Sequence, residues 1–231
     1  MFPVIILAGG LATRLRPITE TIPKAMIDIN GKPFIEYQLN LLKIKGITNV
    51  ILCVGYLGEM IEEYVRDGSD FNMNVSYSYD GEKLLGTGGA IKKAITDLDE
   101  RFFILYGDSY LDLNYAKIEE SYIISKKSGL MTVYKNNNLF DVSNVVFRNN
   151  LLIKYSKKIK SLDMNYIDYG LGILEKQVFI DYNIGDCFDL AEIYENLAVN
   201  NQLFGYEVFN KFYEIGSQEG LKDFTHFIMM R

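Results

Sequence analysis

Residues 1–26 read MFPVIILAGGLATRLRPITETIPKAM, and this stretch decides the fold. An apolar run at 3–8 has strand character and ends at Gly9 and Gly10. In open α/β sheets, ligands bind at the carboxyl ends of the strands. Glycines at such an end let the backbone approach a phosphate chain and direct its N–H groups at it. The stretch therefore predicts a phosphate-binding loop after the first strand.

Three cations follow the glycines at close spacing, namely Arg14, Arg16 and Lys24. The motif GxxxxGK followed by Ser or Thr is absent, which argues against a P-loop ATPase, and GGLATR is not GxGxxG, which argues against a dinucleotide dehydrogenase. Arg14 offers a planar fork to phosphate oxygens, and Lys24 offers a compact positive charge. We expect these two side chains to bind the phosphate groups of a small ligand and Arg16 to support the loop.

The rest of the first half alternates strand-like and helix-like segments. Apolar or alternating patterns predict strands at 49–56, 74–80 and 101–108. Apolar residues at helical spacing, with glycines at several ends, predict helices at 32–46, 58–68 and 86–98. This order indicates βαβ units. The predicted fold class is therefore α/β, a Rossmann-like mixed, mainly parallel sheet flanked by helices.

The second half is less regular. Short strands are expected at 128–135, 141–148 and 151–158, a strand passing into a helix at 169–179, an amphipathic helix at 188–202 and a hairpin at 204–217. No repeat or long linker separates the two halves. We expect one domain over 1–231, in which residues 1–115 form the nucleotide-binding half and residues 116–231 form the half that binds the other substrate.

The composition excludes several functional classes. The net charge is −6 over 231 residues, whereas broad nucleic-acid binding needs a basic surface. No apolar run approaches the roughly 20 residues of a membrane helix, and the N-terminus lacks the features of a signal peptide. Cys53 and Cys187 lack metal-ligand spacing, and the single histidine, His226, has no serine or cysteine motif beside it. We expect a cytoplasmic protein that binds neither nucleic acid nor membrane.

The opening stretch, extended as LAGGLATRLRPITETIPKAMIDINGKPFIEYQL, resembles the signature of the sugar-1-phosphate nucleotidyltransferases, the nucleotide-sugar pyrophosphorylases. The match continues through GKP and LGTGGA to GD. The resemblance implies that an NTP and a sugar 1-phosphate are joined with release of pyrophosphate. It also implies that the loop Leu7, Ala8, Gly9 and Gly10 binds the NTP, that Arg14 binds its triphosphate, and that Lys24 binds the α-phosphate in the transition state.

Two carboxylates are expected to hold Mg²⁺. Asp108 follows an apolar strand in the sequence FFILYGD, and the resemblance assigns it to the metal as a catalytic residue beside Arg14 and Lys24. The family carries a second metal aspartate late in the chain in a D-x-G turn. Here the sequence is FYEIGS, so Glu214 occupies that position. Glutamate keeps the charge but adds one methylene, so the geometry must differ.

The loop LGTGGA is expected to line the nucleobase site through Gly86, Thr87 and Gly88. It resembles the loop of mannose- and heptose-1-phosphate guanylyltransferases, so GTP is the expected nucleotide substrate. Related loops occur in enzymes that use UTP or CTP. A cytidylyl- or uridylyltransferase acting on another phosphorylated capsule or cell-wall precursor therefore stays an alternative.

The acceptor side departs from the family pattern. The usual E-K-P segment is replaced by IKYSKKIK, where Lys158 is the closest match and Lys157 its neighbour. Asp168 stands where sugar-binding members have an asparagine, and Gly170 follows it. Asn144 is expected to line the same cleft. A non-catalytic nucleotide-sensing subunit, which the change at Glu214 leaves open, is the alternative from another class, and a homodimer stays open.

Overall fold

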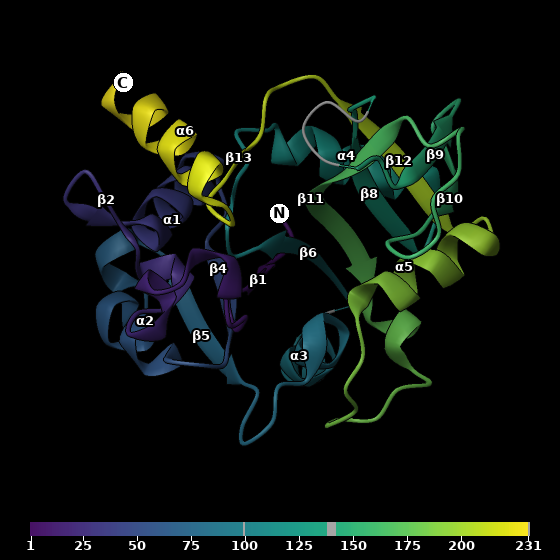
Figure 1. The fold of residues 1–231 in the computed structure, drawn as a ribbon. Helices are drawn as coiled ribbons and strands as arrows, with labels where there is room; N and C mark the ends of the chain where they lie inside the picture. Colours follow the sequence, from purple (N-terminus) through teal and green to yellow (C-terminus); the bar gives the residue numbers. More distant parts are fainter. Residues whose placement is uncertain (99, 138–141, 231) are drawn as a thin grey trace. The chain divides into compact units, whose positions relative to one another are not determined.

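The computed structural model describes residues 1–98, 100–137 and 142–230, and the chain divides into two units. The first unit comprises 1–84, 105–113 and 211–231, and the second comprises 85–104 and 114–210. Each unit is built from segments that are far apart in the sequence (Figure 1). The division differs from a cut into sequence halves, because the C-terminal segment is part of the unit that contains the N-terminal strands.

The first unit contains the parallel strands predicted from the apolar runs. They are β1 (Val4–Leu7), β4 (Asn49–Val54) and β5 (Asn74–Tyr79), in the order β5-β4-β1. Ile51 pairs in parallel register with Ile5 on one side and Ser76 on the other. Nearly all side chains of β1 and β4 are buried, whereas none of β5 is fully buried. A continuous apolar run is what a strand covered on both faces requires.

Further strands contribute to this unit, one of them only in part. β6 (Arg101–Tyr106) leads the chain from the second unit into the first. Two short antiparallel pairs follow, β2 (Asp28–Ile29) with β3 (Lys32–Pro33) and β7 (Ser109–Tyr110) with β13 (Tyr213–Glu214). The second pair matters for function because it places Glu214 opposite Ser109, directly after Asp108.

The helices of the first unit are α1 (Phe34–Ile44), α2 (Gly58–Val65) and α6 (Gln218–Met229). Gly46, just past α1, has a φ of 85°, the left-handed conformation of a glycine that ends a helix. α6 lies beside α1 (Figure 1), because the Phe224 ring packs 5.2 Å from the ring of Phe34 and 5.0 Å from that of Tyr110. This aromatic cluster anchors α6 and so the segment that carries Glu214.

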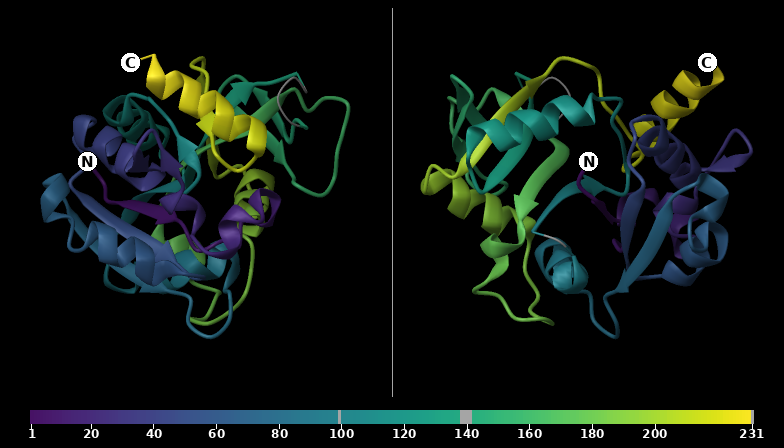
Figure 2. Two further views of the ribbon diagram at one scale, coloured as in Figure 1. Left: turned by 60° about the vertical axis from the view of Figure 1, so that its left-hand side comes forward. Right: turned by 180° about the vertical axis from the view of Figure 1, so that it is seen from behind.

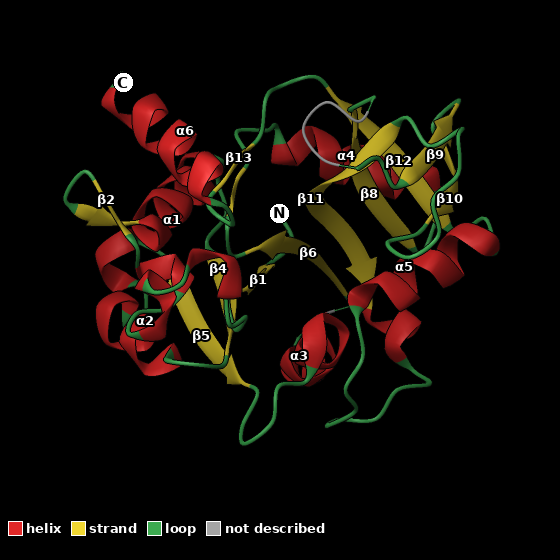
Figure 3. Ribbon diagram, viewed as in Figure 1, coloured by secondary structure: helices red, strands yellow, loops and turns green. Residues whose placement is uncertain are grey.

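The second unit contains a mixed group of strands (Figure 3). They are β8 (Gly129–Lys135), β9 (Val145–Arg148), β10 (Leu151–Tyr155), β11 (Tyr166–Glu175) and β12 (Leu203–Val208), in the order β11-β8-β12-β10-β9. β12 runs parallel to β8, and the other pairs are antiparallel. Its helices are α3 (Gly86–Ala94), α4 (Tyr115–Ser125) and α5 (Leu190–Val199). α4 lies along β12 (Figure 2), and α5 packs on β10.

The α/β class with a mixed sheet flanked by helices is confirmed. The hairpin expected at 204–217 is wrong, because β12 pairs with β8 and β10 while β13 pairs with β7. Helices α4 and α6 were not expected from the sequence. Of the strand expected at 141–148, only 145–148 forms, and residue 141 lies outside the described residues.

Candidate functional site

The glycine loop after β1 is held against the end of β4. Ala8 donates its backbone N–H to the Cys53 carbonyl at 2.8 Å. Gly9 lies so close to the next strand end that a Cβ added there would be 3.0 Å from the Gly55 nitrogen. A Cβ at Gly10 would meet nothing within 4 Å. One glycine of the pair is thus required by packing, and the other borders open space.

The first two predicted cations lie on the turn that follows. Residues Thr13–Leu15 form a short 3₁₀ helix whose Leu15 is buried, while Arg14 and Arg16 on either side are exposed. The turn is tied down by Thr19, whose hydroxyl donates to the Ala12 carbonyl at 2.9 Å. The buried leucine therefore fixes the loop and leaves both guanidinium groups accessible.

Asp108 is positioned by hydrogen bonds to the backbone on both of its sides. The buried Gln38 of α1 donates to the carbonyls of Tyr106 and Ser109, at 3.0 and 2.8 Å. Gly107 donates to the Leu7 carbonyl at 3.0 Å, so the end of β6 is attached to the glycine loop. The Asp108 carbonyl accepts from Ile215 N–H at 2.9 Å, which joins the aspartate to the segment after β13.

Lys24 reaches this aspartate directly. The Lys24 ammonium lies 2.7 Å from Asp108 Oδ2, and both side chains are partly exposed. Lys24 begins a short 3₁₀ helix after Pro23, whose extended backbone conformation ends the preceding loop. The fold thus brings together two predicted catalytic groups that are 84 positions apart in the sequence.

Gly216 marks the point where four predicted residues converge. A Cβ added there would lie 2.6 Å from Glu214 Oε2 and 3.0 Å from Asp108 Oδ2. The same point is 3.3 Å from Arg14 Nη2. Two carboxylates and the Arg14 guanidinium thus lie beside the space that this glycine leaves open, and Lys24 joins the cluster through its ion pair with Asp108. The first unit therefore contains a complete cluster of the predicted phosphate and metal residues.

The Glu214 carboxylate is itself held in place. Its Oε2 accepts from Gly216 N–H, and its Oε1 accepts from the Ser217 hydroxyl at 2.7 Å. Ser217 also caps α6, because its oxygen accepts from Gly220 N–H at 3.0 Å. The longer side chain of glutamate is thus seated on the amino end of α6, where a negative charge is favoured.

The donor set of this cluster suits Mg²⁺. This ion takes oxygen ligands and is usually held by one or two carboxylates together with substrate phosphates. Asp108 and Glu214 supply carboxylate oxygens on either side of a space that even one Cβ would fill. Among the described residues, no group of three or more His, Cys, Asp or Glu side chains could hold a metal. These two carboxylates could therefore hold the ion when substrate phosphates complete its shell.

The loop predicted to face the nucleobase lies in the second unit and packs against Phe188. A Cβ at Gly86 would be 2.5 Å from the Phe188 carbonyl, and one at Gly88 would be 2.3 Å from its ring. Gly88 N–H donates to that carbonyl at 3.0 Å. The Thr87 hydroxyl accepts from Leu190 N–H at 2.8 Å and lies 3.1 Å from Asp189 Oδ1. Close packing is sufficient reason for both glycines, so a role toward a base stays a prediction.

Three of the predicted acceptor residues form one hydrogen-bonded group in the second unit. Asn144 Oδ1 accepts from Asp168 N–H at 3.0 Å. Asp168 Oδ1 in turn accepts from Gly170 N–H at 3.0 Å. Gly170 has a φ of 101°, which glycine adopts without strain. The pairing of β11 with β8 shifts register between Asp168 and Gly172. This irregularity lets the aspartate side chain bond to its own strand.

The Asp168 carboxyl lies in an unusual electrostatic environment. Burial raises its pKa above the ordinary value, although Gly170 N–H, the charge of Lys157 and the Tyr155 hydroxyl act in the opposite direction. The pKa of the buried Tyr194 is raised by desolvation and by the charge of Asp168. The Asp168 carboxyl therefore lies near two tyrosines and a lysine, and its role toward an acceptor stays a prediction.

Lys157 and Asp189 are functional candidates that the sequence did not single out. Lys157 Nζ lies 3.0 Å from Asp189 Oδ1, and its charge acts on Asp168. Lys158, which the sequence favoured, is exposed, and its backbone N–H donates to Ser156 Oγ. Lys157 is exposed as well, and which of these two neighbouring lysines binds the acceptor stays a prediction.

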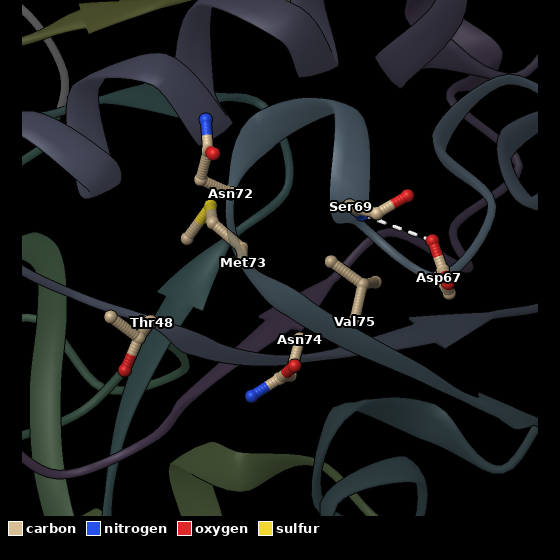
Figure 4. A pocket seen from close by; sticks show the side chains of 7 residues that line it. All are labelled: Thr48, Asp67, Ser69, Asn72, Met73, Asn74 and Val75. Atoms are coloured by element: carbon tan, nitrogen blue, oxygen red, sulfur yellow. Dashed lines mark hydrogen bonds between the residues drawn. The ribbon is translucent and has the colours of Figure 1, made fainter.

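A recess at the other edge of the sheet contains none of the predicted site residues (Figure 4). It is lined by residues around the starts of β4 and β5, namely Thr48, Asp67, Ser69, Asn72, Met73, Asn74 and Val75. Asp67 Oδ1 accepts from Ser69 N–H there at 3.0 Å. Most of the lining is exposed. Since ligands of open α/β sheets bind at the carboxyl ends of strands, this recess is a poor candidate for the functional site.

In the described part of the chain, no helix has the length and apolar character needed to cross a membrane.

Comparison with known proteins shows a similarity in both sequence and fold. The sequence pattern of the family described as Nucleotidyl transferase matches residues 3–140. A D-glycero-alpha-D-manno-heptose 1-phosphate guanylyltransferase of Campylobacter jejuni is 34% identical over 97% of this chain and 98% of that protein. An enzyme of the same name from Aneurinibacillus thermoaerophilus is 32% identical over 97% and 99%. The crystal structure of HddC from Yersinia pseudotuberculosis complexed with GMP-PN is 27% identical, with a TM-score of 0.82 over 99% of this chain and 100% of that one.

Proposed function

The chain belongs to the nucleotidyl transferase family, and from this premise we propose that it joins GTP to a sugar 1-phosphate of the mannose or heptose type. The products are a GDP-sugar and pyrophosphate. The single observation that carries the proposal is the cluster around Gly216, where Arg14, Asp108 and Glu214 meet beside the Lys24 ammonium. The choice of GTP rests on the two heptose 1-phosphate guanylyltransferases that match nearly the whole chain.

The chemistry requires positioning and charge neutralisation. A phosphate oxygen of the acceptor attacks the α-phosphorus of the NTP in line, and a new P–O bond forms. The bond from the α-phosphorus to the oxygen that bridges to the β-phosphorus breaks, and pyrophosphate leaves with that electron pair. The acceptor phosphate is largely dianionic near neutral pH, so a general base is not needed. Catalysis then comes from holding the reacting groups and their charge in place.

The residues of the first unit have separate roles in this scheme. The glycine loop presents backbone N–H groups to the phosphates, and Arg14 binds the triphosphate through its planar fork. Lys24 leaves Asp108 and neutralises the charge that builds on the α-phosphate. Mg²⁺ held by Asp108 and Glu214 would supply further positive charge to the phosphate oxygens.

The residues of the second unit are proposed to bind the acceptor. Asp168 and Asn144 accept hydrogen bonds from sugar hydroxyls, and Gly170 shapes the turn that holds the aspartate. A lysine of the KK turn binds the acceptor phosphate, where the ion pair with Asp189 favours Lys157 over the expected Lys158. Gly86, Thr87 and Gly88 face the nucleotide. The reaction takes place in the cytoplasm, and its product is an activated sugar for a capsule or another cell-surface polysaccharide.

A matrix of nucleotides and acceptors tests the proposal. GTP, ATP, UTP and CTP are each combined with mannose-, heptose- and glucose-type 1-phosphates, and both pyrophosphate and the nucleotide sugar are measured. GTP with a mannose- or heptose-type acceptor is expected to react fastest. A preference for UTP or CTP would favour the alternative transferase. Nucleotide binding without turnover across the whole matrix would favour a nucleotide-sensing subunit and would contradict the proposal.

Two lysine variants make the test specific to the site. Lys24→Ala is expected to lower kcat by about 10²–10³ while the protein stays folded. Lys32→Ala serves as the matched control, because Lys32 is an exposed cation of the same unit whose ion pair with Glu36 lies outside the cluster. Equal loss of activity in both variants would show that the assay responds to general damage rather than to the site.

A further inference from the structure

One oxygen of the carboxylate cluster, Asp108 Oδ2, is already bound to a cation of the chain itself. The Lys24 ammonium donates to this oxygen at 2.7 Å. The same oxygen borders the space beside Gly216, because a Cβ added there would lie 3.0 Å from Asp108 Oδ2 and 2.6 Å from Glu214 Oε2. The Asp108 oxygen that is placed to share a metal ion with Glu214 is therefore the one that Lys24 contacts.

The other three oxygens of the two carboxylates accept from neutral donors. Asp108 Oδ1 accepts from the Ser109 hydroxyl at 3.3 Å, Glu214 Oε1 accepts from the Ser217 hydroxyl at 2.7 Å, and Glu214 Oε2 accepts from Gly216 N–H. Each carboxylate oxygen has two lone pairs, so a neutral donor can stay in place while the oxygen binds a metal ion. An ammonium cannot, because it and a divalent cation on one oxygen repel each other.

The Lys24 side chain can leave Asp108 while its backbone stays fixed. The turn that carries it is closed by Ile27 N–H, which donates to the Lys24 carbonyl at 3.1 Å. The ammonium stands at the end of a flexible four-carbon stem, and its ion pair with Asp108 is partly exposed and therefore weak. A triphosphate carries several negative charges where Asp108 carries one. Phosphates that bind at the glycine loop therefore attract the ammonium away from the carboxylate.

We infer that Lys24 is an internal competitor of the divalent cation, a regulation of the site that rests on the proposed nucleotidyl transfer. Without nucleotide, the ammonium neutralises Asp108, and the two carboxylates hold a divalent cation weakly. When a triphosphate binds, the ammonium moves to its phosphates and releases Asp108 Oδ2. The divalent cation therefore enters with the nucleotide or after it, and each raises the affinity of the chain for the other, as linkage requires.

The first test measures Mn²⁺ binding to the chain without any nucleotide. Lys24→Met keeps most of the length of the side chain and removes its charge. This variant is expected to bind Mn²⁺ about tenfold more tightly than the unmodified protein, since the competing cation is gone. Electron paramagnetic resonance of unbound Mn²⁺ gives both dissociation constants, and circular dichroism verifies the fold. Equal or weaker binding by the folded variant would overturn the inference.

Two further variants show where the gain arises. Lys32→Met removes the same charge from an ion pair with Glu36 that lies outside the cluster, so its Mn²⁺ affinity should stay unchanged. The double variant with Lys24→Met and Asp108→Asn should lose the gain, because the released carboxylate is absent. A similar gain in Lys32→Met, or a gain that persists in the double variant, would overturn the inference by assigning the effect to net charge or to another site.

The second test concerns the order of binding and separates this inference from the proposed function. Each of the four NTPs is titrated into the unmodified protein in EDTA by calorimetry, and the nucleotide that turns over with Mg²⁺ is expected to bind without it. A strict requirement for the divalent cation would overturn the inference and leave nucleotidyl transfer intact. Absence of turnover with every pair of NTP and acceptor would instead overturn the proposed function, while Mn²⁺ binding to Lys24→Met would still decide whether Lys24 competes with the metal.

Discussion

Lys24 and Asp108 are 84 positions apart in the sequence, and the fold places the Lys24 ammonium 2.7 Å from Asp108 Oδ2. Each side chain is about one-fifth to one-quarter exposed, at 21% and 24%. An ion pair of this kind contributes little to stability, about 0–1 kcal/mol. We propose that its role is chemical, because it keeps a cation and a carboxylate beside the glycine loop, where we expect the phosphates to bind.

Replacing Lys24 should therefore separate catalysis from folding. Lys24→Ala is expected to lower kcat by about 10²–10³, equivalent to about 3–4 kcal/mol of lost transition-state stabilisation. The free energy of unfolding should change by no more than about 1 kcal/mol. Steady-state kinetics and urea denaturation measure the two effects. A loss of activity that only parallels a loss of stability would show that the pair is structural.

Ser217 should control how firmly Glu214 can hold a metal. Its hydroxyl donates to Glu214 Oε1 at 2.7 Å and its oxygen caps α6. Ser217→Ala is expected to weaken binding of Mn²⁺, used as a spectroscopic probe, about tenfold and to cost about 1 kcal/mol of stability through the lost cap. Ser217→Thr keeps both bonds and should restore both values.

A cap in the other unit supplies the control for Ser217. Asn114 caps α4, since its side chain accepts from Lys117 N–H at 3.0 Å. Asn114→Ala should cost similar stability, about 1 kcal/mol, and leave Mn²⁺ binding unchanged. If Ser217→Ala binds Mn²⁺ as well as the unmodified protein does, then Ser217 has only a capping role.

The sequence predicted the elements whose signal is local. Strands β1 and β4 are nearly wholly buried, so their apolar runs were unambiguous, and Gly46 ends α1 in the expected left-handed conformation. Helix α6 was missed because its sequence includes a glycine and a β-branched residue, and its stability comes from Phe224 in a cluster with distant aromatic rings. The false hairpin has the same cause, because the partners of β12 and β13 lie far away in the sequence.

The sequence predicted those residues of the candidate site that occupy recognisable motif positions. Arg14, Lys24, Asp108 and Glu214 follow from motif positions, and the structure brings all four together. The contribution of Gly216 could not be predicted, because it is the space that this glycine leaves among side chains from separate segments. The choice between two adjacent lysines depends on where β10 ends, which no pattern in IKYSKKIK reveals.

The two lysines of the KK turn should differ in their effect on the acceptor. Lys157→Ala is expected to raise KM for the sugar 1-phosphate about tenfold, because a charge-assisted bond to its phosphate is lost. Lys158→Ala is the matched control and should change KM less than twofold. KM for the nucleotide should be the same in both variants. A larger effect at Lys158 would assign the acceptor phosphate to that residue and leave Lys157 as a structural partner of Asp189.

Asp168 is expected to lower the stability of the folded chain at neutral pH while it serves to bind the acceptor. Burial raises the pKa of its carboxyl above the value in the unfolded chain. The group therefore favours the folded state most below the unfolded pKa, and that contribution is lost as the pH rises through the folded pKa. At neutral pH the ionised, buried carboxylate destabilises the folded chain relative to a neutral group of the same shape.

Asp168→Asn is such a replacement, because the amide oxygen can still accept from Gly170 N–H. The variant is expected to be more stable than the unmodified protein at pH 7, and this advantage should shrink as the pH is lowered and the aspartate, whose pKa is raised, takes up a proton. KM for the sugar 1-phosphate should rise about tenfold, since a charged acceptor of hydroxyl hydrogen bonds is lost. Urea denaturation across this pH range, with acceptor kinetics at pH 7, measures both effects. A variant that is less stable at pH 7 and unchanged in KM would mean that the carboxylate supports the fold and does not contact the acceptor.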